Sequence, residues 1–443
     1  MLQGIGRRVI GAVERVVNVR DHELRALLWA FAYFFCLLSS YYVLRPLRDE
    51  MGIAGGVRNL HLMFTATFVA MLVAVPLFGA VVARFPRRVF IPWVYRFFVL
   101  NILIFFALLT VTETSPHVAR AFFVWVSVFN LFVVTVFWSF MADLFSNEQG
   151  KRLFGFIAAG GTAGALLGPT VTAVLAVPLG PVNLLLISAV LLELAVQCVR
   201  GLLRCADSAR IANGNSETGT GRMADEQVIG GGMFAGFVHV ARSPYLLFIC
   251  LHVLLLTATA TFLYFQQAEI VAGAFSDPAE RTRIFALIDL AVGLSTLVVQ
   301  LFLTGRLIQR FGVGPALAFM PAVTLAGFLA LAVAPILAVV VAFQALRRAA
   351  DFAITNPALQ ILYTVIPRED KYKSKNFIDT VIFRGGDAAS GWAFTGLKGL
   401  GLELSAIAAA TVPLAAAWIG LALVLGRRQE GLARAPVAAA PAH

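Results

Sequence analysis

Apolar stretches of about twenty residues follow one another along most of the chain, and they restrict its fold more than any other feature. A helix needs about 20 consecutive apolar residues to cross the hydrocarbon layer of a membrane, and only helices and closed barrels satisfy their backbone polar groups there. Charged residues make up 13% of the chain, about half the share typical of soluble domains. Since no strand pattern is evident, the sequence predicts an all-α integral membrane protein.

Breaks at charged residues, prolines and glycines separate twelve predicted transmembrane helices. They lie near residues 24–45, 59–83, 89–112, 118–142, 153–178, 181–203, 244–267, 283–305, 314–334, 336–366, 376–397 and 402–426. Pro357 lies inside the long tenth helix and is expected to kink it, because proline lacks a backbone N–H and its ring crowds the preceding turn.

The distribution of basic residues predicts the orientation in the membrane. The net charge of +11 would also suit a nucleic-acid-binding protein. However, most of the 35 Lys and Arg fall in alternate loops and in the two tails, a pattern that keeps such segments in the cytoplasm. We therefore expect a multi-pass protein of the cell (inner) membrane with both termini cytoplasmic, in contact with the lipid bilayer and not with nucleic acid. The sequence leaves its oligomeric state open.

A long polar run near the middle of the chain separates six predicted helices from another six. It covers residues 204–233 and has the composition of a flexible linker. We expect a cytoplasmic N-tail with an amphipathic pattern (1–23), a first six-helix half (24–203), a cytoplasmic linker (204–243), a second six-helix half (244–426) and a cytoplasmic C-tail (427–443).

The two halves share a weak internal repeat. GAVVARFPRR (79–88) follows the second predicted helix, and GRLIQRFGVG (305–314) follows the eighth, with Gly, an aliphatic pair, Arg and Phe in register. Two six-helix halves joined by a cytoplasmic loop are the architecture of the major facilitator transporters. The sequence resembles that superfamily in this respect, and we expect a major-facilitator-like fold of about twelve helices.

Ionisable side chains inside the predicted helices are the candidate functional residues, because a charge at membrane depth is costly and usually marks a transport pathway. The first group lies in YYVLRPLRDE (41–50). Tyr41, Arg45 and Arg48 recur there at helical spacing, and two acids follow them. Pro46 is expected to disrupt the helix. We expect this stretch to form half of a substrate gate, in which the two acids pair with its arginines.

Further groups lie in the second half of the chain. The tenth and eleventh predicted helices carry six of these residues, and the seventh ends in YFQQAE (264–269). Arg96, Glu193, Asp289 and His252 stand singly, as buried structural residues usually do. The candidate substrate-binding residues are Tyr41, Arg45, Arg48, Gln266, Arg347, Arg348, Lys371, Lys373, Lys375 and Arg384, and the candidate coupling or ion-pair residues are Asp49, Glu269, Asp289, Asp351, Asp379 and Asp387.

The excess of arginine in these groups predicts an anionic substrate, because a guanidinium group binds carboxylate and phosphate oxygens bidentately. The sequence offers no metal-ligand cluster, no nucleophile paired with a base and no nucleotide-hydrolysing loop. GGTAGALLG (160–168) lies inside a predicted helix, so it indicates close helix packing and not a dinucleotide site. We therefore expect neither an enzyme nor a cofactor or metal site.

Three segments resemble the nucleotide transporters of the bacterial and plastid ATP/ADP translocase type. They are YYVLRPLRDE (41–50), FWSFMADLFSNEQGKRLFGFIAAGGTAGALLG (137–168) and DKYKSKNFIDTVIFRGGDAASG (370–391), of which the third is the most specific. The resemblance implies nucleotide transport, with Arg48 and one of Lys371, Lys373 or Lys375 at the positions of family basic residues. Family acids in helices 4 and 7 have no counterpart here, and the helix 7 position falls near Gln266.

The function that we expect is secondary transport of a small anionic organic solute, nucleotide-like by resemblance, through alternating access. Four arginines would attract the substrate, and three acids would neutralise them or carry a coupling proton: Arg45, Arg48, Arg347 and Arg348, and Asp351, Asp379 and Asp387. Two alternatives stay open. One is a proton-coupled major facilitator for an unrelated solute, with Asp289 or Asp351 in the coupling. The other is a membrane receptor or scaffold that does not transport.

Overall fold

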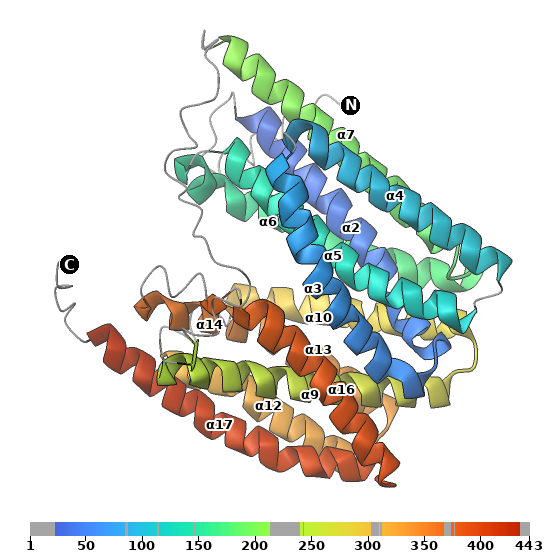
Figure 1. Cartoon of the computed structure of the whole chain (residues 1–443), viewed down its shortest axis with the longest axis vertical. Helices are drawn as coiled ribbons and strands as arrows, with labels where there is room; N and C mark the ends of the chain where they lie inside the picture. The colour runs from blue at the N-terminus through green and yellow to red at the C-terminus, as the bar shows by residue number, and fades with distance from the viewer. Residues whose placement is uncertain are drawn as a thin grey trace. The chain divides into compact units, whose positions relative to one another are not determined.

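Figure 1 shows the computed structural model of the chain. It describes residues 23–84, 87–112, 115–145, 147–212, 240–241, 243–302, 310, 312–366, 374–375 and 377–434. The predicted N-tail apart from its last residue, most of the predicted linker, the end of the C-tail and most of the second repeat turn lie outside the described residues.

All regular structure in the described ranges is helical, which confirms the predicted fold class. The helices are α2 (Leu24–Ala54), η1 (Val57–Asn59), α3 (Leu60–Arg84), α4 (Arg87–Val111), α5 (Pro116–Leu144), α6 (Asn147–Leu179), α7 (Leu184–Ala212), α9 (Pro244–Ala274), α10 (Pro278–Phe302), α12 (Val313–Val333), α13 (Leu337–Ala350), η2 (Asp351–Thr355), α14 (Asn356–Leu362), η3 (Tyr363–Val365), η4 (Ile378–Ile382), α16 (Phe383–Gly399) and α17 (Leu404–Arg434).

Ten of the described helices are long and apolar enough to cross a membrane. The two remaining predicted spans are the tenth and eleventh, and in each of them a five-residue π-helix, η2 or η4, interrupts the α-helical pattern. Pro357 lies in the first turn of α14, directly after η2. Its missing N–H prevents regular α-helical bonding at that point, so the expected irregularity takes the form of a π segment. Such segments occur frequently at functional sites.

Helix α2 continues through Pro46 to Ala54, so the expectation that Pro46 disrupts this helix is wrong. The residues beyond the proline are mostly buried, among them Leu47, Met51 and Ile53. Their burial outweighs the single backbone hydrogen bond that proline removes. As a result, Arg45 and Arg48 lie within a continuous helix and not at its end.

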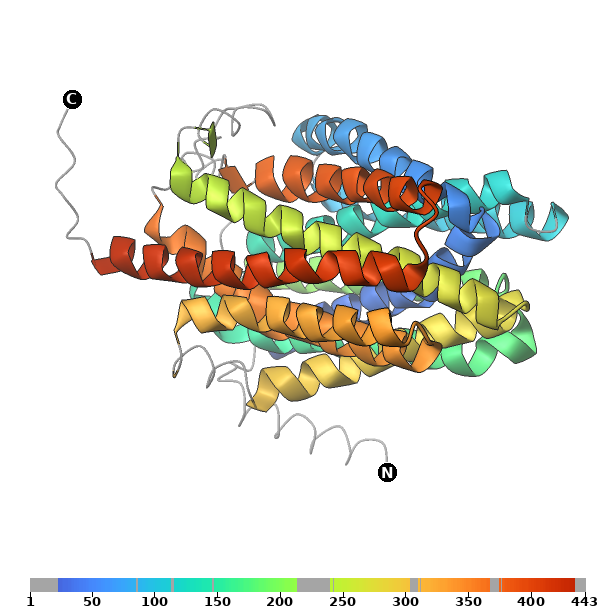
Figure 2. The same ribbon diagram turned by 90° about the horizontal axis from the view of Figure 1, so that it is seen from below.

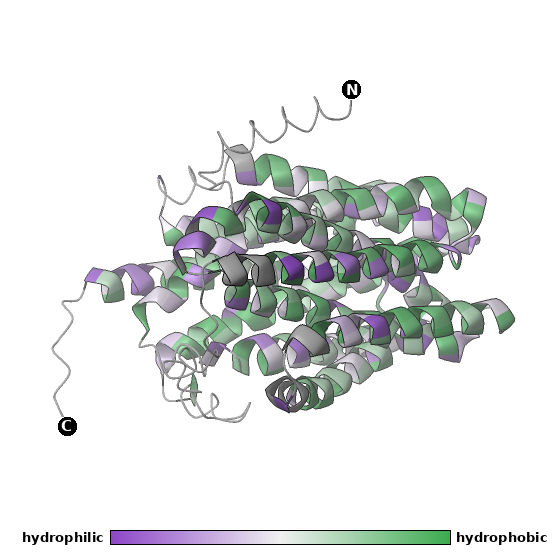
Figure 3. Cartoon of the chain, turned by 90° about the horizontal axis from the view of Figure 1, so that it is seen from above, coloured by the Kyte–Doolittle hydropathy of each residue, from purple (hydrophilic) through white to green (hydrophobic). Residues whose placement is uncertain are grey.

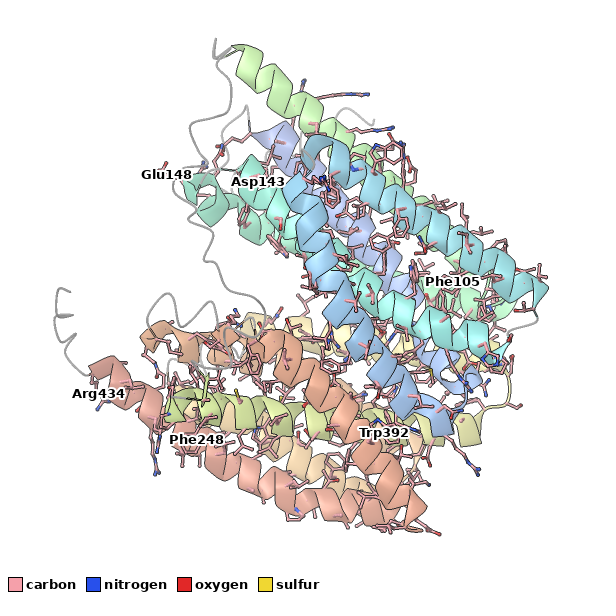
Figure 4. All side chains as sticks on the ribbon, in the orientation of Figure 1. Phe105, Asp143, Glu148, Phe248, Trp392 and Arg434 are labelled. Atoms are coloured by element: carbon pink, nitrogen blue, oxygen red, sulfur yellow. The ribbon has the colours of Figure 1, made fainter. Side chains whose placement is uncertain are left out.

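The chain forms two compact units. The first comprises Met1–Gly55, Val73–Met223 and Asp277–Leu290, and the second comprises Gly56–Leu72, Ala224–Ser276 and Ala291–His443. Helices α3 and α10 therefore each contribute residues to both units. In the second unit, the first turns of α3 contact α16, where the indole of Trp392 (Figure 4) donates a 3.1 Å hydrogen bond to the hydroxyl of Thr65.

Helix α2 lies at the centre of the first unit, where it packs against α5, α6 and α7, while α4 packs along α7 (Figure 1). Glycines of α6 permit the close approach to α2. A Cβ atom on Gly164 would lie 2.5 Å from the carbonyl oxygen of Phe35, and one on Gly168 would lie 2.6 Å from the Cβ of Tyr42. The structure thus confirms that GGTAGALLG serves close helix packing.

In the second unit, α12 packs along α17, and α9 packs against α16 and α17 (Figure 2). A polar contact inside this packing joins His252 of α9 to Trp418 of α17, whose indole N–H donates to the imidazole Nδ1 at 3.0 Å. Both side chains are fully buried, so His252 is a core residue as expected. Figure 3 shows that hydrophobic residues predominate along the helices, with hydrophilic residues at intervals among them.

Candidate functional site

A set of paired charges lies near the C-terminal end of α2 in the first unit. We call it the α2 charge cluster; it consists of Arg45, Arg48, Asp49 and Glu50 of α2 with Arg281 and Asp289 of α10. Arg281 donates two hydrogen bonds to Glu50, from Nε at 2.7 Å and from Nη2 at 2.8 Å. This is the bidentate geometry that gives arginine its strongest contacts with carboxylates. The Glu50 side chain is 0% exposed.

Arg45 pairs with Asp289, whose carboxylate lies 3.5 Å from the Arg45 Nε and is 1% exposed. The Arg45 guanidinium also lies 5.7 Å from the centre of the Tyr42 ring, and the Tyr41 ring lies 5.1 Å from the same ring. The candidates Tyr41, Arg45 and Asp289 are thus brought together. Asp289 was expected as a single buried residue, and the structure gives it a partner from α2.

Arg48 is held on three sides. Its Nη1 donates to Asp49 at 3.0 Å, its Nε donates to the Ser127 hydroxyl at 2.9 Å, and its guanidinium lies 4.0 Å from the centre of the Phe123 ring. The expected pairing of Asp49 with an arginine of this stretch is confirmed. The same expectation for Glu50 is wrong, because Arg281 of α10 reaches the carboxylate bidentately.

A second polar group lies between α9, α13 and α16 in the second unit. We call it the α9–α13 polar group, and Arg347 is its central residue. The Arg347 side chain is buried, and its Nη2 donates to the Leu256 carbonyl at 3.0 Å and to the Thr259 hydroxyl at 3.4 Å. Its Nε has no hydrogen-bond partner among the described residues. Within the described residues, no carboxylate lies within 4.0 Å of this guanidinium.

Asp351 and Asp387 are the candidate acids of this group. Asp351 follows Arg347 by four positions in the chain, and Asp387 lies on α16. Asp387 lies 3.5 Å from Arg384 and accepts a 3.3 Å hydrogen bond from the Thr261 hydroxyl. The structure therefore joins Arg384 to Asp387, a pair that the sequence analysis did not propose, and it gives no direct Arg347–Asp351 salt bridge.

Two glutamines of α9 extend the α9–α13 polar group. Gln344 of α13 donates a 2.6 Å hydrogen bond to Gln267. The neighbouring Gln266 is fully buried, and in the described part of the chain neither its amide nitrogen nor its amide oxygen has a hydrogen-bond partner. A buried amide without a partner is rare, since each unmet polar atom costs about 1–3 kcal/mol. Gln266 is therefore a strong candidate for a residue that binds the substrate.

The remaining candidates are more scattered. Glu269 forms a 2.9 Å salt bridge with Lys398, and Lys375 donates a 2.6 Å hydrogen bond to Gln360. Asp379 is exposed, and the Arg348 guanidinium lies 5.9 Å from the ring centre of Phe352. Lys371 and Lys373 lie outside the described residues.

Sequence reasoning missed several contributors to these groups. Arg281 was assigned to a loop, whereas α10 begins at Pro278 and holds Arg281 in its first turn. Thr259 and Gln267 are polar residues on an apolar helix and are eight positions apart, so they return to the same face after about two turns. That spacing was the available signal, but it does not show which neighbouring helix the face contacts.

Comparison with known proteins identifies related folds. Residues 27–373 match the model of the Major Facilitator Superfamily, and no curated protein matches the sequence. The nucleoside transporter NupG is 14% identical, with 94% of this chain and 100% of that chain covered and a TM-score of 0.60. The POT family transporter PepTSo is 15% identical, with 93% and 98% covered and a TM-score of 0.61.

A third solved structure is a bacterial homologue of the iron transporter ferroportin in an inward-facing state. It is 12% identical, with 92% of this chain and 98% of that chain covered, and its TM-score is 0.61. At these identities the likeness shows a shared fold, and it does not carry over the substrate of any of these proteins.

Proposed function

The chain belongs to the Major Facilitator Superfamily, and from this premise we propose that it carries an anionic organic solute of nucleotide-like chemistry across the inner membrane. It is a multi-pass membrane transporter and not an enzyme. The termini would lie in the cytoplasm, as the distribution of basic residues indicates. Flux would follow alternating access, the mechanism typical of secondary transporters with this architecture.

The observation that carries the proposal is the environment of Arg347. A buried charge without a partner is strongly unfavourable, so buried arginines normally contact a carboxylate directly. Arg347 is 4% exposed, has an Nε–H without a partner, and has no carboxylate within 4.0 Å in the described part of the chain. A substrate carboxylate or phosphate would supply the missing anion, and guanidinium geometry favours two parallel hydrogen bonds to such a group.

Gln266 supports a substrate with polar groups besides its charge. Its buried amide offers two N–H donors and one acceptor oxygen, none of them used within the described residues. Such an amide can bond a base edge, a sugar hydroxyl or a phosphate oxygen. The resemblance of three sequence segments to ATP/ADP translocases makes a nucleotide the first candidate, with Arg48 and Lys375 as the described basic residues at the matching positions.

The α2 charge cluster would act as a gate. Its bonds join the end of α2 to the first turns of α10, through Arg45–Asp289 and Glu50–Arg281. Substrate oxyanions that approach Arg45 would compete with Asp289 for its guanidinium. Binding would thus loosen one of the two connections, and the bidentate Glu50 contact would have to break separately.

Counterflow in reconstituted vesicles tests this proposal. Vesicles that contain the protein are loaded with ATP, ADP, inorganic phosphate or citrate, and uptake of labelled ADP or of the labelled form of the loaded anion is measured. We expect counterflow for at least one anion, at least a tenfold loss in Arg347→Gln, and partial retention in Arg347→Lys, which keeps the charge but not the planar fork. Arg283→Gln is the matched control, since Arg283 is exposed on α10. Wild-type protein that moves none of these anions under any gradient would refute the proposal.

A proton-coupled mechanism is the second candidate, and the buried Asp289 favours it. Protonation of Asp289 would release Arg45 from its ion pair, which links a proton to the α2 charge cluster. In that case a protonophore abolishes concentrative uptake, and Asp289→Asn retains counterflow but loses the response to a pH gradient. If the protonophore leaves uptake unchanged, transport is not driven by a proton gradient, and the result favours the exchange mechanism.

A further inference from the structure

An ion pair lies on the outer face of the first unit, where α4 and α7 run side by side (Figure 1). Arg96 of α4 donates to Glu193 of α7 from Nη2 at 3.1 Å and from Nε at 3.5 Å. The two side chains are 45% and 37% exposed. Both were expected as buried residues, so that expectation is wrong: they pair with each other on the surface, which we call the α4–α7 face.

The ion pair is part of a longer polar chain on this face. Gln197 donates to the Glu193 carboxylate, and Arg200 donates to the Gln197 amide oxygen at 3.3 Å. The three α7 residues lie within about two helical turns. This face therefore presents one acid and two bases as a connected strip.

The strip lies at membrane depth. The apolar spans that hold it are Phe90–Val111 of α4 and Leu184–Cys205 of α7. At 1.5 Å per residue, Arg96 lies about 9 Å from the start of its span, and Glu193 lies about 14 Å from the start of its own. Both residues are thus inside a hydrocarbon layer of about 30 Å.

The surroundings of the strip are apolar and also exposed. They comprise Trp93, Phe97 and Leu100 of α4 and Leu186, Val190 and Leu194 of α7. Lipid tails offer no hydrogen bonds, so they are a poor environment for a half-exposed ion pair with unused donors and acceptors. A polar partner that enters from the membrane side would relieve this cost.

We propose that a second copy of this chain covers the α4–α7 face, which makes the transporter a two-fold symmetric dimer. In a two-fold interface each copy offers the same patch to the other. With the axis along the membrane normal, equivalent residues lie at equal depth. Arg96 of one copy can then approach Glu193 of the other, and the four charges form a closed, neutral ring. The exposed aromatic and aliphatic residues around it supply the packing.

The pattern of α7 agrees with such an interface. Its outward residues recur at alternating intervals of four and three positions: Leu186, Val190, Glu193, Gln197, Arg200 and Arg204. This is the spacing of a seam along which one helix packs on another. Any exposed helix face shows this recurrence, including one that only lipid covers. The charges along the face are what favour a protein partner over lipid. The proposal goes beyond the proposed function, since it does not depend on which solute is carried.

A charge-exchange experiment tests the interface directly. Full-length chains with donor or acceptor fluorophores fused at the C-terminus are reconstituted in vesicles of phosphatidylethanolamine and phosphatidylglycerol, and energy transfer between chains is measured. Arg96→Glu gives a copy with two acids at the interface, and Glu193→Arg gives a copy with two bases. We expect wild type to show transfer, each variant alone to lose most of it, and the mixture of the two variants to recover it.

Recovery in the mixture identifies contact between copies, because neither variant can form the pair within its own chain. The proposal is refuted if wild type shows no transfer in these vesicles and none in vesicles of phosphatidylcholine, which would leave a lipid as the occupant of the face. It is also refuted if the mixture shows no more transfer than the separate variants.

Disulfide cross-linking provides a second test that does not alter the charges. In a Cys205→Ser background, Val190→Cys places a thiol on the α4–α7 face, and Val174→Cys places one at a similarly exposed site on α6. With copper phenanthroline as the oxidant, two thiols lose two electrons and two protons to form one disulfide. We expect at least a fivefold greater dimer yield for Val190→Cys than for Val174→Cys. Equal yields would contradict the proposal.

Discussion

Replacement of Arg281 should lower the free energy of unfolding more than replacement of Glu50, although the two side chains form a single contact. In Arg281→Gln, Glu50 loses its cationic partner in a fully buried position, where an unpaired carboxylate is strongly disfavoured. Loss of one partner of a buried pair costs about 3–5 kcal/mol. In Glu50→Gln, Arg281 is 14% exposed and can turn toward water. The free energy of unfolding should therefore fall only by the contribution of a hydrogen bond to a charged group, about 1.5–3 kcal/mol.

A double-mutant cycle measures this asymmetry. The free energy of unfolding of wild type, both single variants and the double variant is obtained in bicelles by steric trapping. We expect Arg281→Gln to be the least stable protein and the double variant to be more stable than it, because no uncompensated charge remains. The adjacent pair Arg283–Glu280 is the control. It is exposed, with 3.8 Å between its atoms, so its coupling should not exceed about 1 kcal/mol.

The result that would refute this reasoning is additivity. If the effects of Glu50→Gln and Arg281→Gln add within about 0.5 kcal/mol, the two side chains do not interact energetically. The buried bidentate contact would then contribute nothing to the connection between α2 and α10, and the gate proposed for the α2 charge cluster would lose its structural basis.

Two further predictions concern the helix contacts. Gly164→Ala should destabilise the protein by about 1–3 kcal/mol, because its Cβ would overlap the backbone of α2. In the control Gly155→Ala on the same helix, the new Cβ meets no atom within 4 Å, so this variant should be neutral or slightly stabilising. Thermal unfolding of both variants measures the difference. Trp418→Phe should cost about 1–3 kcal/mol, because it leaves the His252 Nδ1 buried without a donor. The double variant Trp418→Phe/His252→Phe should then be no less stable than Trp418→Phe, and a further loss in the same assay would contradict this account.

Apolar length and the charge pattern were enough to predict an all-helical membrane fold, because both follow from the cost of polar groups in hydrocarbon. They also predicted where the ionisable side chains would fall along the helices. The close approach at GGTAGALLG was predictable for the same reason, since small residues in a membrane helix have few other uses. The outcome at Pro46 was not, because it depends on how well the residues after the proline are buried by other helices.

The partners of the charged residues were decided by the tertiary structure. The sequence placed Glu50 beside Arg48, but the carboxylate bonds Arg281, which is 231 positions away. It assigned Asp351, Asp379 and Asp387 as partners of Arg347 and the other arginines, but no described carboxylate contacts the Arg347 guanidinium directly. It treated Arg96 and Glu193 as single buried charges, although they form one exposed pair across two helices.

The sequence by itself determined that this chain crosses a membrane as a bundle of helices with arginines and acids inside them. Whether a segment can cross a membrane depends on the hydropathy of its own residues, which the sequence shows directly. Only the tertiary structure decided which charges neutralise each other and which remain available to a ligand or a second copy. Hydrogen bonds act over about 3 Å, and the positions that lie within that distance are set by helix packing between residues far apart in the chain.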